Sequence, residues 1–236
     1  MKILALDSSG LVASVALLEN DTLVAEYTTN FKKTHSQTLL PMLDEIVTMT
    51  EIKLEEIDAI AVAKGPGSFT GLRIGSATAK GLGLALKKPV IGVPTVDALA
   101  YNLYGVEDLT CPIMDARRGQ VYTGLYTFEG DSFNVLVKQQ AVMLVEMIEE
   151  IKKLGKRVIF LGDGVEVHRE KIMELLGEQC YFAPAHVNKQ RAGAVAAIAS
   201  VYYQEGKIET AMEHEPEYLR VSQAERELAE ELAKQE

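Results

Sequence analysis

The first thirty residues contain three short apolar stretches separated by polar turns. The stretches lie at residues 2–9, 12–20 and 22–30, and the turns contain Ser9-Gly10 and Asn20-Asp21. Apolar runs bounded by such turn residues are typical of strands joined as hairpins. We therefore expect three consecutive strands that pair antiparallel.

Residues 36–50 show apolar positions at helical spacing, among them Leu39, Leu43 and Ile46. Pro41 lies inside this pattern, so the helix either begins close to Pro41 or kinks there. The following stretches predict a strand, a helix and another strand, at residues 57–67, 71–87 and 88–95. A strand–helix–strand unit with short connections indicates parallel pairing through a right-handed crossover.

The second half of the chain repeats this plan after a change of composition at residues 104–108. Strands are expected at 110–130, 133–142, 157–164 and 180–185, and helices at 144–155, 167–177 and 191–206. The charged stretch 223–236 predicts a solvated helix or a frayed tail. We expect a duplicated α/β architecture with lobes at 1–104 and 105–236, in which the last helix can pack back on the first lobe.

The glycine-rich stretch "KGPGSFTGLRIG" at 64–75 does not match the two common phosphate-binding motifs. The GxxxxGK[ST] spacing of a P-loop fails because Leu72-Arg73 follow Gly71. The GxGxxG fingerprint of dinucleotide-binding folds fails because the third glycine is one position late and the next strand carries no acid. We expect a tight strand-to-helix turn, with Ser68 or Thr70 capping the helix.

The helix at 71–87 is apolar on two sides and polar only along a narrow stripe. Such a helix is usually covered on both sides. One side can cover the sheet, and the other side can meet either the helix at 36–50 or another protein chain. The sequence leaves these two alternatives open.

Composition limits the function classes. The 236 residues carry a formal charge of −10, which argues against nucleic-acid binding by this chain alone. No membrane span and no signal peptide are apparent, and the two cysteines form no CxxC pair. We expect a cytoplasmic protein that has no contact with membranes.

Five motifs together resemble the TsaB (YeaZ) family. They are "LALDSS" at the start, "HSQTLLP" at 35–41, "KGPGSFTGLRIG" at 64–75, "DARRGQVY" at 115–122 and "PEYLR" at 216–220. The resemblance implies the two-lobe ASKHA fold, which is actin/hexokinase/Hsp70-like and ribonuclease H-like. It also implies a role in making N6-threonylcarbamoyladenosine beside the anticodon of tRNAs that read codons beginning with A.

The family implies a subunit that is not an enzyme on its own. Its main partner is TsaD, the transferase, and TsaE joins them; tRNA is met only through the complex, and a homodimer forms without TsaD. The two helices at 36–50 and 71–87 are expected to form the face that contacts TsaD and that forms the homodimer. The residues expected to make these contacts are Leu39, Leu43, Ile46, Phe69, Leu72, Arg73, Gly75, Ser76, Ala79 and Gly83.

The catalytic paralogue resembles this chain but carries a His-x-x-x-His metal pair after the corresponding strand. Thr95 and Leu99 stand at those two positions here, and no two of the four histidines lie within four residues. Two histidines four apart on one helix face can hold one metal ion, so a local metal pair is excluded. We expect no metal and no required cofactor.

Weak nucleotide binding remains an alternative. Asp7, Ser8 and Ser9 lie where kinases of this fold face phosphate, and Gly162 and Gly164 could approach an adenosine. The same residues can instead simply close tight turns. A small-molecule kinase or ATPase of the same fold is therefore the second hypothesis, although it lacks an obvious catalytic carboxylate. Asp97 is expected to cap a helix, and Asp115 either forms an ion-pair and turn cluster with Arg117 and Arg118 or faces the cleft between the lobes.

Overall fold

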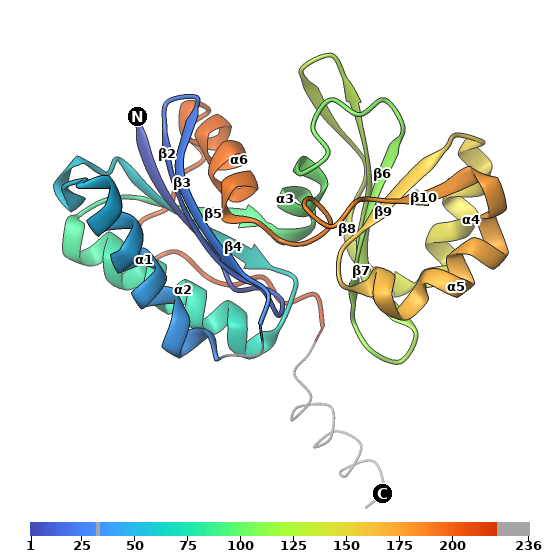
Figure 1. Cartoon of the computed structure of the whole chain (residues 1–236), viewed down its shortest axis with the longest axis horizontal. Helices are drawn as coiled ribbons and strands as arrows, with labels where there is room; N and C mark the ends of the chain where they lie inside the picture. The colour runs from blue at the N-terminus through green and yellow to red at the C-terminus, as the bar shows by residue number, and fades with distance from the viewer. Residues whose placement is uncertain (32–33, 221–236) are drawn as a thin grey trace, which may run out of the picture.

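The computed structural model describes residues 1–31 and 34–220 and contains two five-stranded sheets, side by side (Figure 1). The first sheet has the order β3-β2-β1-β4-β5, with strands at Lys2–Asp7 (β1), Ala13–Glu19 (β2), Thr22–Thr29 (β3), Ala59–Gly65 (β4) and Val90–Pro94 (β5). The first three strands pair antiparallel, and β1, β4 and β5 pair parallel. Both pairings predicted from the sequence are confirmed.

The second sheet repeats this topology. Its order is β10-β9-β6-β7-β8, with strands at Leu109–Asp115 (β6), Gln120–Glu129 (β7), Ser132–Met143 (β8), Val158–Leu161 (β9) and Cys180–Phe182 (β10). Here β6, β7 and β8 are antiparallel, and β6, β9 and β10 are parallel. Two successive copies of one strand order confirm the duplicated α/β, ASKHA-type architecture.

Helices cover both faces of the first sheet. On one face lie α1 (His35–Thr50) and α2 (Phe69–Leu86), and on the other lies α6 (Ala192–Gln204) (Figure 1). Alternate residues of β1 serve the two faces, as strand geometry requires: Leu4 and Leu6 pack with α1 and α2, and Ile3 and Ala5 pack with α6. α1 begins six residues before Pro41 and continues through it, with Pro41 exposed.

The second sheet is covered by α4 (Leu144–Leu154) and α5 (Gly164–Leu176) on one face and by α3 (Thr95–Tyr101) on the other. Thus α3 follows a strand of the first sheet but packs on the second, and α6 follows a strand of the second but packs on the first. The boundary at 104–105 stays a prediction, and the expected helix at 223–236 lies outside the described residues. Within 1–31 and 34–220, no helix has the length and apolar character needed to cross a membrane.

Candidate functional site

The glycine turn between β4 and α2 brings three backbone segments together. A Cβ at Gly65, whose φ is +122°, would lie 2.2 Å from the carbonyl oxygen of Glu217. A Cβ at Gly67 would lie 2.2 Å from the Ser9 carbonyl oxygen. The Ser68 hydroxyl caps α2 by accepting from the Gly71 amide at 3.3 Å, as predicted. The glycines therefore serve close backbone packing within the chain.

The β1–β2 turn uses its polar groups internally. Asp7, Ser8 and Ser9 are at most 2% exposed. The amide and hydroxyl of Ser9 donate to Asp7 Oδ1 at 2.8 and 2.6 Å, and the Ser8 hydroxyl donates to the Gly71 carbonyl at 2.9 Å. Burial raises the pKa of Asp7. These contacts close the turn and hold it against α2. Of the two roles considered for these residues, nucleotide binding and turn closure, the contacts serve turn closure.

Gly162 and Gly164 form a similar close turn between β9 and α5. A Cβ at Gly162, whose φ is +102°, would lie 2.2 Å from the Ile113 carbonyl oxygen, and one at Gly164 would lie 2.9 Å from it. The Gly162 amide donates to the Asn188 carbonyl at 2.8 Å. Both glycines thus pack the turn against β6.

A cavity of about 400 Å³ lies between the two sheets, beside these turns. His35, Asp115 and Asp163 contribute polar side chains to it, together with Ser68 and Tyr218. The Asp115 amide donates to Asp163 Oδ1 at 3.4 Å, and burial raises the pKa of the Asp163 carboxyl. Among the described residues, no cluster of three or more His, Cys, Asp and Glu side chains could hold a metal ion.

Asp97 does not cap α3, contrary to our expectation. The helix begins after Pro94 without a side-chain cap, and Asp97 lies in its first turn. Its Oδ1 accepts a 2.7 Å hydrogen bond from the Tyr126 hydroxyl on β7. Burial raises the pKa of Asp97, and this hydrogen bond opposes that rise. Asp97 therefore joins α3 to the second sheet.

The positions of the paralogue's histidine pair are part of the core. Thr95 is fully buried and its hydroxyl accepts from the Gly65 amide at 3.1 Å. Leu99 is 1% exposed and packs in the cluster between α3 and the second sheet. Leu99 has no atom that could bind a metal ion, and the Thr95 hydroxyl is engaged by the Gly65 amide.

Most of the predicted partner-contact residues are buried inside the chain. α1 and α2 turn the following side chains toward their own sheet: Leu39, Leu43, Ile46, Leu72, Gly75, Ser76, Ala79 and Gly83. Gly75 lies so close to Ser8 that a Cβ would be 2.5 Å from its hydroxyl oxygen. These eight residues cannot contact another chain while packed in this way. Only Phe69, half-buried, and Arg73, exposed, remain accessible.

The accessible face of α2 carries Arg73, Ala77, Gly81, Leu84 and Ala85. Leu84 is 55% exposed, and on the neighbouring α1 Leu40 and Met49 are 56% and 74% exposed. Arg73 lies four and eleven residues before Ala77 and Leu84, so all three share one helix face. The cations Arg73, Lys80 and Lys87, spaced seven residues apart, were the sequence signal that could have identified this face.

A strap, residues 205–220, ties the chain end to the first sheet. Glu209 forms an antiparallel bridge with Val90 of β5, and His214 is fully buried with Nδ1 3.4 Å from Glu209 Oε2. The Tyr218 ring lies 4.7 Å from the Phe69 ring, and its hydroxyl accepts from Arg73 Nε at 3.3 Å. The "PEYLR" motif thus holds the end of the strap against α2 through Tyr218.

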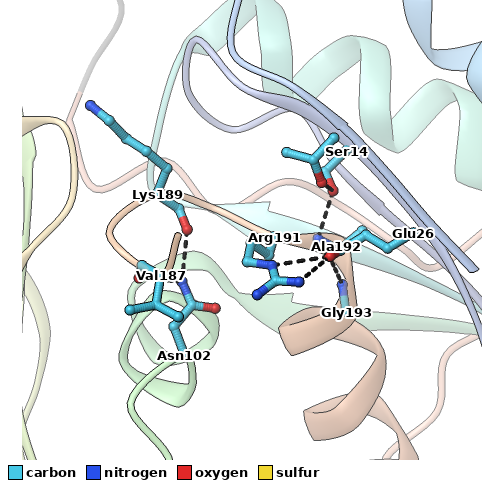
Figure 2. Close-up of polar contacts among 9 residues, drawn as sticks. Ser14, Glu26, Asn102, Val187, Lys189, Arg191, Ala192 and Gly193 are labelled. Atoms are coloured by element: carbon cyan, nitrogen blue, oxygen red, sulfur yellow. Dashed lines mark hydrogen bonds and ion pairs between the residues drawn. The ribbon is translucent and has the colours of Figure 1, made fainter. Parts of the chain in front are cut away.

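The crossover from the second sheet to α6 is held at both ends (Figure 2). Asn102, after α3, donates to the carbonyls of Val187 and Lys189 at 3.0 and 2.7 Å. At the start of α6, the Glu26 carboxylate pairs with Arg191 and accepts from the Gly193 amide at 2.8 Å. A carboxylate at a helix N-terminus satisfies free amides and complements the helix dipole. Sequence reasoning missed these contacts, since they join distant segments.

Comparisons with known proteins extend over nearly the whole chain. A family model described as "TsaD: tRNA N6-adenosine threonylcarbamoyltransferase" matches residues 22–228. A Bacillus subtilis protein named "tRNA threonylcarbamoyladenosine biosynthesis protein TsaB" is 37% identical, covering 95% of this chain and 96% of its own. The Escherichia coli protein of the same name is 33% identical, covering 93% and 95%.

Among solved structures, a Pseudomonas aeruginosa protein described as uncharacterized, with similarity to peptidase YeaZ, has a TM-score of 0.79 and 26% identity. The match covers 93% of this chain and 99% of that one. The family model is named for the transferase, whereas the two relatives aligned over their full lengths are both TsaB proteins. The full-length relatives are the more specific of the two findings.

Proposed function

This chain belongs to the TsaB (YeaZ) family, and on that premise we propose that it acts in tRNA threonylcarbamoyladenosine biosynthesis as a non-catalytic subunit. It binds and activates TsaD, which transfers the threonylcarbamoyl group from threonylcarbamoyl-AMP to N6 of the adenosine beside the anticodon. TsaE joins this complex in the cytoplasm. The net charge of −10 favours contact with tRNA through the complex rather than by this chain alone.

The observation that carries the proposal is the accessible face of α1 and α2. The two helices lie side by side on the outer face of the first sheet (Figure 1). Leu40 and Met49 of α1 and Leu84 of α2 are more than half exposed, and small exposed residues of α2 lie beside Leu84. Exposed apolar side chains on neighbouring surface helices favour contact with another protein. We propose that TsaD binds this face, and that a homodimer uses it when TsaD is absent.

The interior of the molecule supports a non-catalytic role. The polar groups of the β1–β2 turn are bonded to one another and to α2, and Thr95 and Leu99 are core residues. A catalytic group must be free to contact its substrate. Asp7 is 1% exposed and Ser9 is 0% exposed. We propose that no cofactor is required and that any nucleotide affinity is weak.

The test is the mass of the assembly in solution, measured by light scattering after size exclusion, alone and with TsaD. Gly81→Arg changes the proposed face, because nothing lies within 4 Å of a Cβ at Gly81. Val167→Arg on α5 is the matched control, since Val167 is 62% exposed on the other sheet. We expect Gly81→Arg to lose both assemblies and the control to keep them. If Gly81→Arg keeps both, this face is not the contact.

The alternative, a kinase or ATPase, is tested by calorimetry with ATP and magnesium and by a turnover assay. Our proposal predicts weak or no binding and no turnover by the chain alone. Magnesium-dependent ATP binding with turnover would favour the alternative, and the cavity beside Asp115 and Asp163 would then be the first place to examine.

A further inference from the structure

One stretch of this acidic chain contains no carboxylate. The whole chain has 34 acidic and 24 basic residues, yet none of the acidic residues lies between Asp58 and Asp97. The same stretch carries five cations: Lys64, Arg73, Lys80, Lys87 and Lys88. Three of them, Arg73, Lys80 and Lys87, recur every seven residues and so follow one side of α2 and its C-cap. Positive charge is thus concentrated along this helix.

Apolar and small residues lie between these cations. We call Arg73, Ala77, Gly81, Leu84 and Lys87 the α2 stripe; all five are exposed. Gly81 has open space above it, so another chain can approach the helix backbone closely. The stripe therefore offers apolar contact area bordered by positive charge.

The positive charge of the C-terminal end of this helix is not neutralised. Within residues 1–31 and 34–220, neither Lys87 nor Lys88 forms an ion pair. Lys80 Nζ donates to the carbonyls of Met212 and His214, which are neutral groups. An occupant with carboxylates and a few apolar side chains would match this surface.

Residues 221–236 of the same chain have this chemistry. Their sequence, "VSQAERELAEELAKQE", contains five glutamates against Arg226 and Lys234. Leu228 and Leu232 are four residues apart, a spacing typical of one apolar helix face. This segment continues directly from the strap, whose Tyr218 lies beside the start of α2.

The attachment point allows the segment to reach the stripe. Tyr218 packs on Phe69 at the first residue of α2, and the described chain ends at Arg220. The 18 residues of α2 span about 27 Å, whereas sixteen residues can extend to about 50 Å. The short tether also raises the effective concentration of the segment near the α2 stripe to on the order of 1 mM.

We propose that residues 221–236 dock on the α2 stripe of their own chain, with Glu231 facing Lys87 and Lys88. Leu228 and Leu232 then cover Gly81 and Leu84. The docking is independent of any partner. Its consequence, competition with TsaD for the same face, rests on the proposed function.

Disulfide trapping in the full chain tests the docking. Leu84→Cys is combined with Leu232→Cys in a Cys180→Ser background; Cys111 can stay because burial raises its thiol pKa to about 12. The matched control replaces Leu84→Cys by Leu154→Cys, a residue 46% exposed on α4. Formation of the disulfide in a glutathione buffer is followed by mass spectrometry.

We expect the 84–232 disulfide to form within one chain about tenfold faster than the 154–232 disulfide. Salt at about 0.5 M, or Lys87→Glu with Lys88→Glu, should remove the difference. Equal rates for the two pairs overturn the proposal. Disulfides formed mainly between chains also overturn it, because a second copy would then supply the segment.

Competition is measured separately as affinity for TsaD. If the docked state holds about 90% of molecules, Glu231→Lys should lower the apparent Kd about tenfold. An unchanged Kd with a normal 84–232 disulfide overturns competition and leaves docking intact. Loss of TsaD binding by every variant, wild type included, overturns the proposed function instead.

Discussion

Gly71 and Gly81 form a matched pair within α2, and we predict that the same substitution has opposite effects at the two positions. Neither residue has a positive φ, so alanine suits both backbones. At Gly81 nothing lies within 4 Å of a Cβ. At Gly71 a Cβ would lie 2.0 Å from the carbonyl oxygen of Ser8, at the end of β1. The main difference between the two positions is the space available for a methyl group.

Gly81→Ala should stabilise the protein by about 0.5–1 kcal/mol, because alanine is the better helix former. Gly71→Ala forces α2 away from β1, an overpacking that costs about 1–3 kcal/mol. It also disturbs the 2.9 Å bond from the Ser8 hydroxyl to the Gly71 carbonyl, worth about 1 kcal/mol. After the helix-propensity gain is subtracted, we expect a net loss of about 1–3 kcal/mol.

For a chain of this size these changes correspond to a rise in Tm of roughly 1–4 °C for Gly81→Ala and a fall of roughly 2–12 °C for Gly71→Ala. The chain contains no tryptophan, so circular dichroism at the helix band is the suitable assay. A chain with two lobes can unfold in two steps, and the first-sheet transition is then the one to compare. Two shifts of the same sign, or a Gly71→Ala protein as stable as wild type, would refute the close approach of α2 to β1.

Three further predictions concern buried polar contacts. Tyr126→Phe leaves Asp97 without its donor, and we expect a loss of about 1–3 kcal/mol in urea unfolding. The loss should be greater at pH 7 than at pH 4. The pKa of Asp97 is higher in the folded than in the unfolded protein, so the protein loses stability as the pH rises above the unfolded pKa. Without the Tyr126 hydroxyl the folded pKa of Asp97 rises further, and this loss becomes larger. Equal losses at both pH values would contradict this. Glu26→Gln weakens the N-terminal cap of α6 and should lower the free energy of unfolding by about 1–2 kcal/mol in thermal unfolding. The control, Glu174→Gln, removes one partner of an exposed ion pair and should cost less than about 0.5 kcal/mol. Similar costs for the two variants would argue against the cap. Burial lowers the pKa of His214, so its contribution to stability is present above the unfolded pKa of about 6.5 and is lost as pH falls. His214→Gln should flatten the decline between pH 7.5 and 5 in urea titrations, and parallel profiles would exclude this role.

Local chemistry made the strands, the glycine turn and the Ser68 cap predictable. Alternating apolar runs, two glycines around Pro66 and a serine before a helix each act within a few residues of sequence. The same reasoning identified α1 and α2 as helices, whereas most of the partner-contact residues taken from the family resemblance lie on the sides of these helices that the structure buries. Which side is buried depends on how β1 and β4 lie beneath the helices, and that is set by long-range sheet pairing.

The contacts between distant segments were beyond local reasoning. Asp97 looked like a cap because an aspartate near a helix start usually is one. Its partner, Tyr126, lies 29 residues away on the second sheet, and burial makes that single hydrogen bond decisive for Asp97. Glu26 and the α6 amide that it caps are 167 residues apart. Nothing in the spacing of either pair predicts the contact.

The arrangement around α2 limits how the protein can communicate with a partner. α1 lies along one side of α2, and the strap, through His214 and Tyr218, lies along another. The sheet covers its inner face, so the α2 stripe is the part left accessible. At the N-terminal end of this stripe, Arg73 contacts both Phe69 and Tyr218, and these two rings also line the cavity between the sheets. A partner that moves Arg73 must therefore alter the wall of that cavity. A change in tyrosine fluorescence on TsaD binding that Tyr218→Phe reduces would be the sign of this coupling, and an identical change in both proteins would show that the cavity wall is unaffected.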